Sequence, residues 1–144
     1  MQGEEKNTST IFHGEAHPEW IVSIDEVPLV SRMIDSREPP RYRGEVEPID
    51  PIAGHIPGAV NHFWKANINE EGYYLEPRQL RQMMSEAYGS TAANEVVFYC
   101  GSGVTACQNI LAVVHAGLPM PRLYAGSWSE WSSLPDNPVA KGDK

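Results

Sequence analysis

The chain is organised around the stretch VVFYCGSGVTAC, which occupies positions 96–107. Its first four residues, 96–99, favour a short buried strand, because β-branched and aromatic residues bounded by turn signals are typical of that state. Two glycines then form a turn. Helical spacing follows, so a helix is expected to begin near Val104 and to end before Gly117, a residue type suited to the position after a helix. One face of that helix is expected to carry Val104, Gln108, Leu111 and His115.

Cys100 lies where this strand would end and the helix would begin. The free N–H groups and the positive dipole end of the helix would then face its sulfur. Glycines on both sides of Ser102 let the backbone curl, so that several N–H groups point inward and form an anion cradle. Both effects stabilise a thiolate and make it available as a nucleophile. The alternative for Cys100 is a small buried hydrophobic residue at a strand end.

The sequence Cys-Gly-Ser-Gly-Val-Thr at 100–105 resembles the active-site loop of the rhodanese (sulfurtransferase) family, in the form typical of 3-mercaptopyruvate sulfurtransferases. In that family the cysteine takes a sulfane sulfur from a donor, holds it as a persulfide and passes it to a nucleophilic acceptor. The resemblance implies that Cys100 is the catalytic cysteine and that Ser102 assists proton transfer. It also implies a substrate-binding loop whose N–H groups cradle the sulfur, formed by Gly101, Gly103, Val104 and Thr105.

A cluster of arginines follows an expected strand that ends at Asp35. Taken alone, the cluster reads as a solvated charge run, offset by neighbouring glutamates. The segment also resembles the Asp-x-Arg-x-x-x-Arg-[Phe/Tyr] stretch of the catalytic rhodanese domain. The resemblance implies that Arg41 binds the anionic group of the substrate, and a guanidinium suits a carboxylate because it donates two parallel hydrogen bonds. It further implies that Asp35 and Arg37 form a structural pair that ties the strand end to neighbouring loops.

The stretch Gly-His-Ile-Pro-Gly-Ala-Val-Asn at 54–61 reads as a turn into a short strand, with the Pro-Gly pair as punctuation. It resembles the Gly-His-Ile-x-Gly-Ala signature of the same family. His55 invites the hypothesis of a general base, but the resemblance implies a structural role for this histidine. Aromatic residues flank the following loop and are expected to serve as core and lid packing: Phe63, Trp64, Tyr73 and Tyr74.

Strands and helices alternate along the rest of the chain. Ser23 and Glu26 have capping-box spacing, which predicts a short helix running towards Arg32, and a strand is expected over 29–35. Pro77 predicts the start of a helix that ends near Gly89. The face of that helix expected to pack on the sheet carries Leu80, Met83, Met84 and Ala87.

The last elements are a strand at 122–124 and a helix carrying Trp128 and Trp131, which share one face and would anchor the core. This stretch resembles the Gly-Ser-Trp-x-Glu-Trp signature near the C-terminus of sulfurtransferases. The alternation predicts the α/β class, with a parallel sheet and helices on both faces, as the resemblance to the rhodanese fold also implies. Cys100 and Arg41 both follow strands, so we expect them to meet at the carboxyl ends of the sheet.

The predicted organisation has three parts. Residues 1–17 read as a flexible tail or interdomain linker, 18–138 as the rhodanese domain, and 139–144 as a polar tail within a segment, 135–144, of little expected structure. The resemblance is to the C-terminal, catalytic half of tandem two-domain sulfurtransferases. It therefore makes a missing N-terminal rhodanese domain a candidate partner, because the family's active site lies between the two halves.

Composition narrows the class of protein. A net charge of −8 argues against a nucleic-acid partner, so an anionic sulfur donor must be attracted by a local patch. No apolar run is long enough to span a bilayer and no secretory leader is apparent, so we expect no membrane association and a cytoplasmic location. The two cysteines are poorly spaced for a disulfide, and Cys107 is expected to be buried. No metal site, nucleotide loop or other cofactor is predicted.

The donor remains open between 3-mercaptopyruvate and thiosulfate. The loop residues 101–103 carry no basic side chain, unlike thiosulfate-preferring members of the family, and Ser102 favours 3-mercaptopyruvate. Mercaptopyruvate enzymes often have a second arginine nine residues after the first, where this chain has Asp50; Arg43 is a candidate replacement. The acceptor is expected to be a thiol or cyanide.

Two other functions are weighed. A phosphatase or arsenate reductase of this fold needs Cys-x5-Arg, but Ala106 stands at the arginine position and the loop is one residue short. A non-catalytic rhodanese-like binding module is the stronger alternative for a half domain in isolation. Such modules commonly lose the cysteine, and Cys100 is present.

Overall fold

A four-stranded parallel sheet forms the centre of the computed structural model, which describes residues 3–143. Its strands are β1 (Arg32–Asp35), β2 (Val60–Asn61), β3 (Val96–Tyr99) and β4 (Arg122–Leu123), in the order β2-β1-β3-β4. Asp35 pairs with Tyr99 in the register of the two central strands. Residues 36 and 100 therefore emerge side by side at the carboxyl edge of the sheet.

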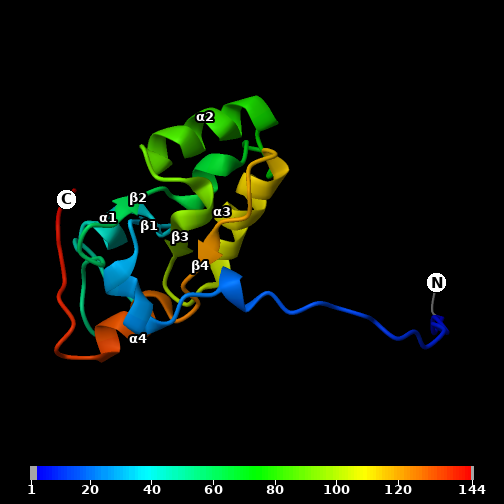
Figure 1. Ribbon diagram of the computed structural model, residues 1–144, viewed down its shortest axis with the longest axis horizontal. Coiled ribbons are helices and arrows are strands. Elements are labelled where there is room, and N and C mark those ends of the chain that lie inside the picture. The colour runs from blue at the N-terminus through cyan, green and yellow to red at the C-terminus, as the bar shows by residue number, and fades with distance from the viewer. Residues whose placement is uncertain (1–2, 144) are drawn as a thin grey trace.

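The residues of β3 alternate between two hydrophobic layers. Val96 and Phe98 pack with α2 (Pro77–Tyr88) and α3 (Val104–His115) on one face. Val97 and Tyr99 pack on the other face, against α1 (Pro39–Tyr42), α4 (Ser127–Ser133) and the 3₁₀ helix η2 (Ile24–Leu29). Figure 1 shows α2 and α3 on one side of the strands and α1 and α4 on the other. The predicted fold class, an α/β protein with helices on both faces, is confirmed.

The predicted helices at 77–88 and 104–115 and the strand at 96–99 are confirmed. The segment after Ser23 differs from prediction. Its capping box forms, but η2 is a six-residue 3₁₀ helix that ends at Leu29, because Pro28 interrupts the helical hydrogen bonds. The following strand accordingly begins at Arg32 rather than at 29. Three further 3₁₀ turns join the elements: η1 (Pro18–Trp20), η3 (Trp64–Asn67) and η4 (Ala93–Glu95).

The face of α3 that carries Val104, Gln108, Leu111 and His115 points away from the sheet. Val104 is 73% exposed and Leu111 is 55% exposed. The buried face consists instead of Ala106, Asn109, Ala112 and Val113. Cys107 lies on the exposed side, so the prediction that it is buried is wrong. Helical spacing identifies a face, but only the position of the sheet decides which face is covered.

The two ends of the chain behave differently. Residues 3–16 are extended and exposed, and in Figure 1 they run away from the sheet (blue). Near the C-terminus, Ala140 exchanges two backbone hydrogen bonds with His55, at 2.9 and 3.0 Å, in an antiparallel bridge. The expectation of little structure after residue 135 is therefore wrong for the residues up to this bridge. Backbone hydrogen bonding to a distant loop leaves no side-chain pattern in the sequence.

A buried polar network joins α3 to the loops that leave β1 and β2. Asn109 donates to the Ser36 hydroxyl (2.8 Å) and to the His62 carbonyl oxygen (3.0 Å). Asn67 donates to Asn109 (2.5 Å) and accepts from the His62 ring (2.8 Å). Burial lowers the pKa of His62, partly opposed by its hydrogen bond to Asn67. Because the burial effect dominates, His62 is a neutral imidazole at neutral pH, and the acceptor facing Nε2 favours the tautomer with its proton on that nitrogen.

The network predicts a stability loss in mild acid. Below about pH 6.5 the unfolded chain protonates His62 while the folded chain resists, so the free energy of unfolding falls as pH decreases, by at most about 1.4 kcal/mol per pH unit. Replacement His62→Gln keeps a donor for Asn67 but removes the titration. Urea unfolding between pH 7.5 and 5 should show a shallower decline for the variant than for the wild type. Equal declines in both proteins would contradict this assignment.

Candidate active site

The backbone of the Cys100 loop donates a hydrogen bond to the cysteine sulfur. The N–H of Gly103 donates to Cys100 Sγ at 3.1 Å, from the residue directly before α3. Cys100 itself is only 1% exposed. The sulfur therefore lies at the N-terminal end of a twelve-residue helix and accepts a backbone hydrogen bond, a position typical of nucleophilic cysteines.

Backbone conformation and close packing both favour glycine at position 103. Its φ of +87° lies in the left-handed region, and a Cβ on it would lie 2.7 Å from the carbonyl oxygen of Ala125. The turn from 124 to 129 thus packs directly against the Cys100 loop. It also supplies two backbone hydrogen bonds, from Trp128 N–H to the Cys100 carbonyl and from Ser129 N–H to the Gly101 carbonyl, both at 2.9 Å.

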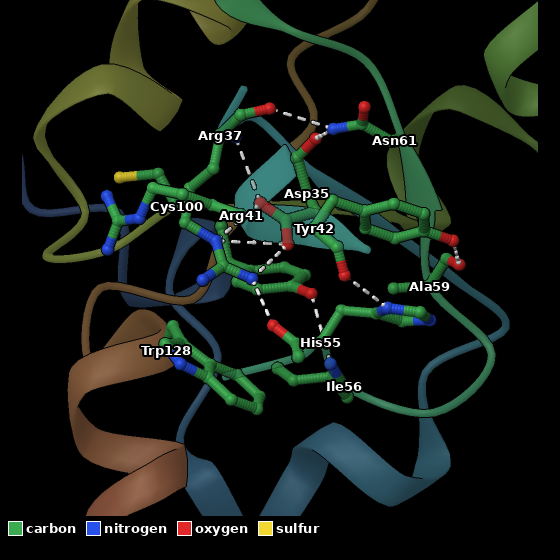
Figure 2. A network of polar contacts seen from close by, with 12 residues as sticks. Asp35, Arg37, Arg41, Tyr42, His55, Ile56, Ala59, Asn61, Cys100 and Trp128 are labelled. Carbon is green, nitrogen blue, oxygen red and sulfur yellow. Dashed lines mark hydrogen bonds and ion pairs between the residues drawn. The ribbon is translucent and has the colours of Figure 1, made fainter. Parts of the chain in front are cut away.

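Arg41 extends from α1 to the same loop. A Cβ built on Gly101 would lie 3.5 Å from Arg41 Nη2, so the guanidinium lies against the cysteine loop. Figure 2 shows the Arg41 guanidinium and the Cys100 sulfur directed to the same side. Arg41 Nη2 also contacts two carboxylates, Glu47 Oε1 at 2.9 Å and Asp50 Oδ2 at 3.4 Å. The sequence places Asp50 here in place of a second arginine, and its charge offsets that of Arg41.

Asp35 and Arg37 form a fully buried ion pair at the end of β1 (Figure 2). Arg37 donates to Asp35 through Nη2 at 2.6 Å, through Nε and through its own backbone N–H. It also donates to the Gly54 carbonyl at 2.7 Å and lies 5.0 Å above the Trp128 ring. This one guanidinium therefore joins the β1 end to the 54–61 loop and to α4.

Hydrogen bonds and ion pairs keep Arg37 and Glu47 charged despite their burial. Burial lowers the pKa of Arg37, but the hydrogen bonds and charge of Asp35 outweigh it and leave the pKa above its ordinary value. Burial raises the pKa of Glu47, but N–H groups of Asp50 and Ile49 and the Arg41 guanidinium outweigh it, so the pKa lies below its ordinary value. Both residues are charged at neutral pH.

His55 lies behind this arrangement rather than in front of it. Its Nδ1 is 2.7 Å from the carbonyl oxygen of Tyr42, and its ring stacks on the Tyr42 ring at 3.9 Å. The side chain is fully buried and does not line the cavity described next. This position suits packing rather than proton transfer to a substrate.

A cavity of about 370 Å³ opens in front of Cys100. The structure brings most of the predicted site residues to its wall: Arg37, Arg41, Cys100, Gly101, Ser102, Val104 and Thr105. Gly103 lies beneath the wall, holding the sulfur, and Asp35 lies behind Arg37. Other lining residues had not been assigned to the site from sequence: Glu38, Ile49, Phe63, Trp64 and Ser129. Ser129 donates to Asp50 Oδ1 at 2.6 Å, a contact between segments 79 residues apart that no local pattern reveals.

Comparison with protein-family models matches residues 18–134 to the rhodanese-like domain. The chain belongs to the rhodanese-like domain family. This rhodanese-like chain is 55% identical, over 77% of its length, to a probable 3-mercaptopyruvate sulfurtransferase of Pseudomonas aeruginosa. It is 42% identical over 76% of its length to a putative thiosulfate sulfurtransferase of Mycobacterium tuberculosis, and 34% identical over 97% to human 3-mercaptopyruvate sulfurtransferase. The chain spans 39%, 38% and 50% of these three relatives, respectively.

Solved structures also resemble this chain. The wild-type structure of EanB superposes with a TM-score of 0.78 at 26% identity, covering 88% of this chain and 32% of EanB. An anaerobic ergothioneine biosynthesis enzyme from Chlorobium limicola, in complex with trimethyl histidine, gives a TM-score of 0.76 at 27% identity, covering 87% and 32% of the two chains. Within residues 3–143, no helix is both long and apolar enough to cross a bilayer.

Proposed function

We propose that this rhodanese-like domain is a sulfurtransferase that moves a sulfane sulfur from 3-mercaptopyruvate or thiosulfate to a thiophilic acceptor. The observation that carries the proposal is the Gly103 N–H donating to Cys100 Sγ at 3.1 Å, on the wall of a cavity that Arg41 also lines. The names of relatives that are 34–55% identical support the same activity. In this proposal Cys100 is the catalytic cysteine and forms a persulfide.

The chemistry requires two displacements at sulfur. The Cys100 thiolate attacks the transferable sulfur of the donor, and the bond from that sulfur to the rest of the donor breaks. The electron pair leaves with sulfite from thiosulfate, or with the enolate of pyruvate from 3-mercaptopyruvate. An acceptor thiolate or cyanide then attacks the outer sulfur of the persulfide, and Cys100 departs as a thiolate.

The surrounding residues take defined roles in this scheme. Arg41 binds the carboxylate or sulfonate-like end of the donor, because a charge-assisted hydrogen bond to an anion is stronger than a neutral one. The N–H groups of the loop 101–105 cradle the transferred sulfur, as backbone nests do for anions. Ser102, an exposed residue of the cavity wall, relays a proton to the departing enolate of pyruvate. Asp35, Arg37 and His55 support the loops.

We infer 3-mercaptopyruvate as the preferred donor and thiosulfate as the second. The Ser102 hydroxyl can relay the proton that the enolate of pyruvate needs. Residues 101–103 carry no basic side chain, unlike the loops of thiosulfate-preferring members of the family. The probable 3-mercaptopyruvate sulfurtransferase is also the more identical of the two bacterial relatives named above. Asp50 argues against 3-mercaptopyruvate as the donor, because its carboxylate offsets the Arg41 charge that would bind the carboxylate of the donor.

The remaining assignments are part of the same proposal. Residues 18–138 form the catalytic domain, which takes a thiol or cyanide as acceptor without a cofactor, in the cytoplasm. These relatives are about twice as long as this chain, so an N-terminal rhodanese domain is the proposed partner.

The role of Arg41 can be tested by turnover with each donor and cyanide. Replacement Arg41→Ala removes a charge-assisted hydrogen bond, which corresponds to a loss of about 10- to 100-fold in the second-order rate constant for either donor. The half-saturating donor concentration should rise more than the limiting rate falls. Arg43→Ala is the matched control, because Arg43 pairs with exposed Glu45 away from the cavity wall. Equal rate constants for the wild type and Arg41→Ala would exclude this donor-binding role.

A further inference from the structure

Ser127 has an unusual backbone conformation. Its φ is +56°, and within the described part of the chain no other non-glycine residue has a positive φ. The left-handed region crowds a Cβ against the backbone, so a serine there is held at an energetic cost. Ser127 is also completely buried, at the first position of α4. An outlier that the fold retains in this way calls for a compensating interaction.

The compensating interaction is a hydrogen bond to the cysteine loop. The Ser127 hydroxyl donates its proton to the carbonyl oxygen of Tyr124, at 2.9 Å. The lone pairs of the same oxygen accept the backbone N–H of Cys100, at 3.0 Å. One hydroxyl thus closes its own turn and reaches the reactive residue across 27 positions of sequence.

The Cys100 N–H needs such an acceptor. The paired register of β1 and β3 ends at Tyr99, so Cys100 has left the ladder that satisfies its predecessors. Its N–H is buried away from water, where a missing acceptor is costly. On its other side, the Cys100 carbonyl accepts from Trp128 N–H at 2.9 Å. The peptide groups on both sides of the Cys100 Cα are therefore held by two adjacent residues of α4.

We propose that Ser127 is a positioning residue for sulfur transfer. By fixing the Cys100 main chain, its hydroxyl sets the direction of the Cα–Cβ bond and keeps Sγ on the Gly103 N–H. This inference rests on the proposed persulfide function. Ser127 does not line the cavity, and its hydroxyl bonds only main-chain atoms, the Cys100 N–H and the Tyr124 carbonyl, so it acts through the backbone.

The test separates the hydroxyl from the backbone conformation. Ser127→Ala removes the hydroxyl and keeps the crowded φ, whereas Ser127→Gly removes the hydroxyl and relaxes it. Ser132→Ala is the matched control: Ser132 is a buried serine of the same helix, and its hydroxyl has no hydrogen-bond partner among the described residues. Each protein is loaded from 3-mercaptopyruvate and from thiosulfate, well below its unfolding midpoint, and persulfide formation is followed by intact mass.

Both Ser127 variants should load at least tenfold more slowly at saturating donor, with the half-saturating donor concentration unchanged, and Ser132→Ala should load like the wild type. Ser127→Gly should unfold at a higher temperature than Ser127→Ala and still load as slowly. Wild-type loading by either folded Ser127 variant would overturn the proposal, because only stability would then depend on the hydroxyl.

A second readout keeps this inference separate from the proposed function. Alkylation of Cys100 by iodoacetamide at pH 7 needs no sulfur donor, so it reports on the placement of the Cys100 sulfur even if no donor loads the wild type. Slower alkylation in both Ser127 variants than in Ser132→Ala is expected. Equal alkylation rates in all the proteins would overturn the positioning role, whereas a wild type that alkylates normally and never loads would overturn the proposed function.

Discussion

Replacement Arg37→Met is expected to lower the free energy of unfolding by about 3–5 kcal/mol, because it leaves the buried Asp35 carboxylate without its counter-ion. Methionine retains much of the aliphatic volume of arginine, so loss of the guanidinium dominates the change. The same replacement leaves the Gly54 carbonyl without its 2.7 Å donor and removes the cation above the Trp128 ring. Urea unfolding followed by tryptophan fluorescence measures the effect.

The control for this prediction is Arg43→Met. Arg43 also pairs with a nearby carboxylate, Glu45, at 2.7 Å, but both partners are partly or largely exposed. Solvent screens exposed ion pairs, so the control should unfold at nearly the same urea concentration as the wild type. An equal decrease in the free energy of unfolding in the two variants would show that the burial of Arg37 does not matter. That result would contradict its role in joining the end of β1 to the 54–61 loop and to α4.

Replacement Gly103→Ala is expected to lower stability and sulfur loading together. The new Cβ would lie 2.7 Å from the Ala125 carbonyl oxygen at a φ of +87°, which together cost about 2–4 kcal/mol. Relief of that contact moves the 103 N–H away from Cys100 Sγ. Loss of this hydrogen bond to the attacking sulfur should slow persulfide formation by about tenfold or more.

Gly117→Ala isolates the backbone component of this effect. Gly117 has a φ of +78°, and a Cβ there would meet no other atom within 4 Å. Its replacement should cost about 1–2 kcal/mol and leave loading unchanged. If Gly103→Ala loads sulfur at the wild-type rate while folded, the 103 N–H has no part in holding the thiolate.

Local signals were sufficient to predict the central unit. Residues 96–99 are β-branched and aromatic, Gly103 precedes the helix, and Gly117 follows it, so the strand, turn and helix come from neighbouring residues alone. The burial of Trp128 and Trp131 also follows from their spacing on one helix face.

Apart from the early end of η2, which Pro28 causes locally, the features missed from sequence depend on distant parts of the chain. Cys107 is exposed because the sheet covers the opposite face of α3, and Ala140 is ordered because its backbone pairs with His55. Ser127 and Ser129 reach Cys100 and Asp50 across 27 and 79 positions, respectively. No periodicity or capping rule encodes such contacts. The resemblance to a known family supplied Arg41 and the Asp35–Arg37 pair, which local physical chemistry read as a solvated charge run.

The most direct test of the central claim is the intact mass of the protein after incubation with 3-mercaptopyruvate or, separately, thiosulfate. The wild type should gain the mass of one sulfur atom, which fragmentation assigns to Cys100 rather than Cys107, and a reducing thiol should remove it. Cys100→Ser should gain nothing under the same conditions. A gain that persists in Cys100→Ser, or that maps to the exposed Cys107, would contradict a persulfide held at the Gly103 N–H.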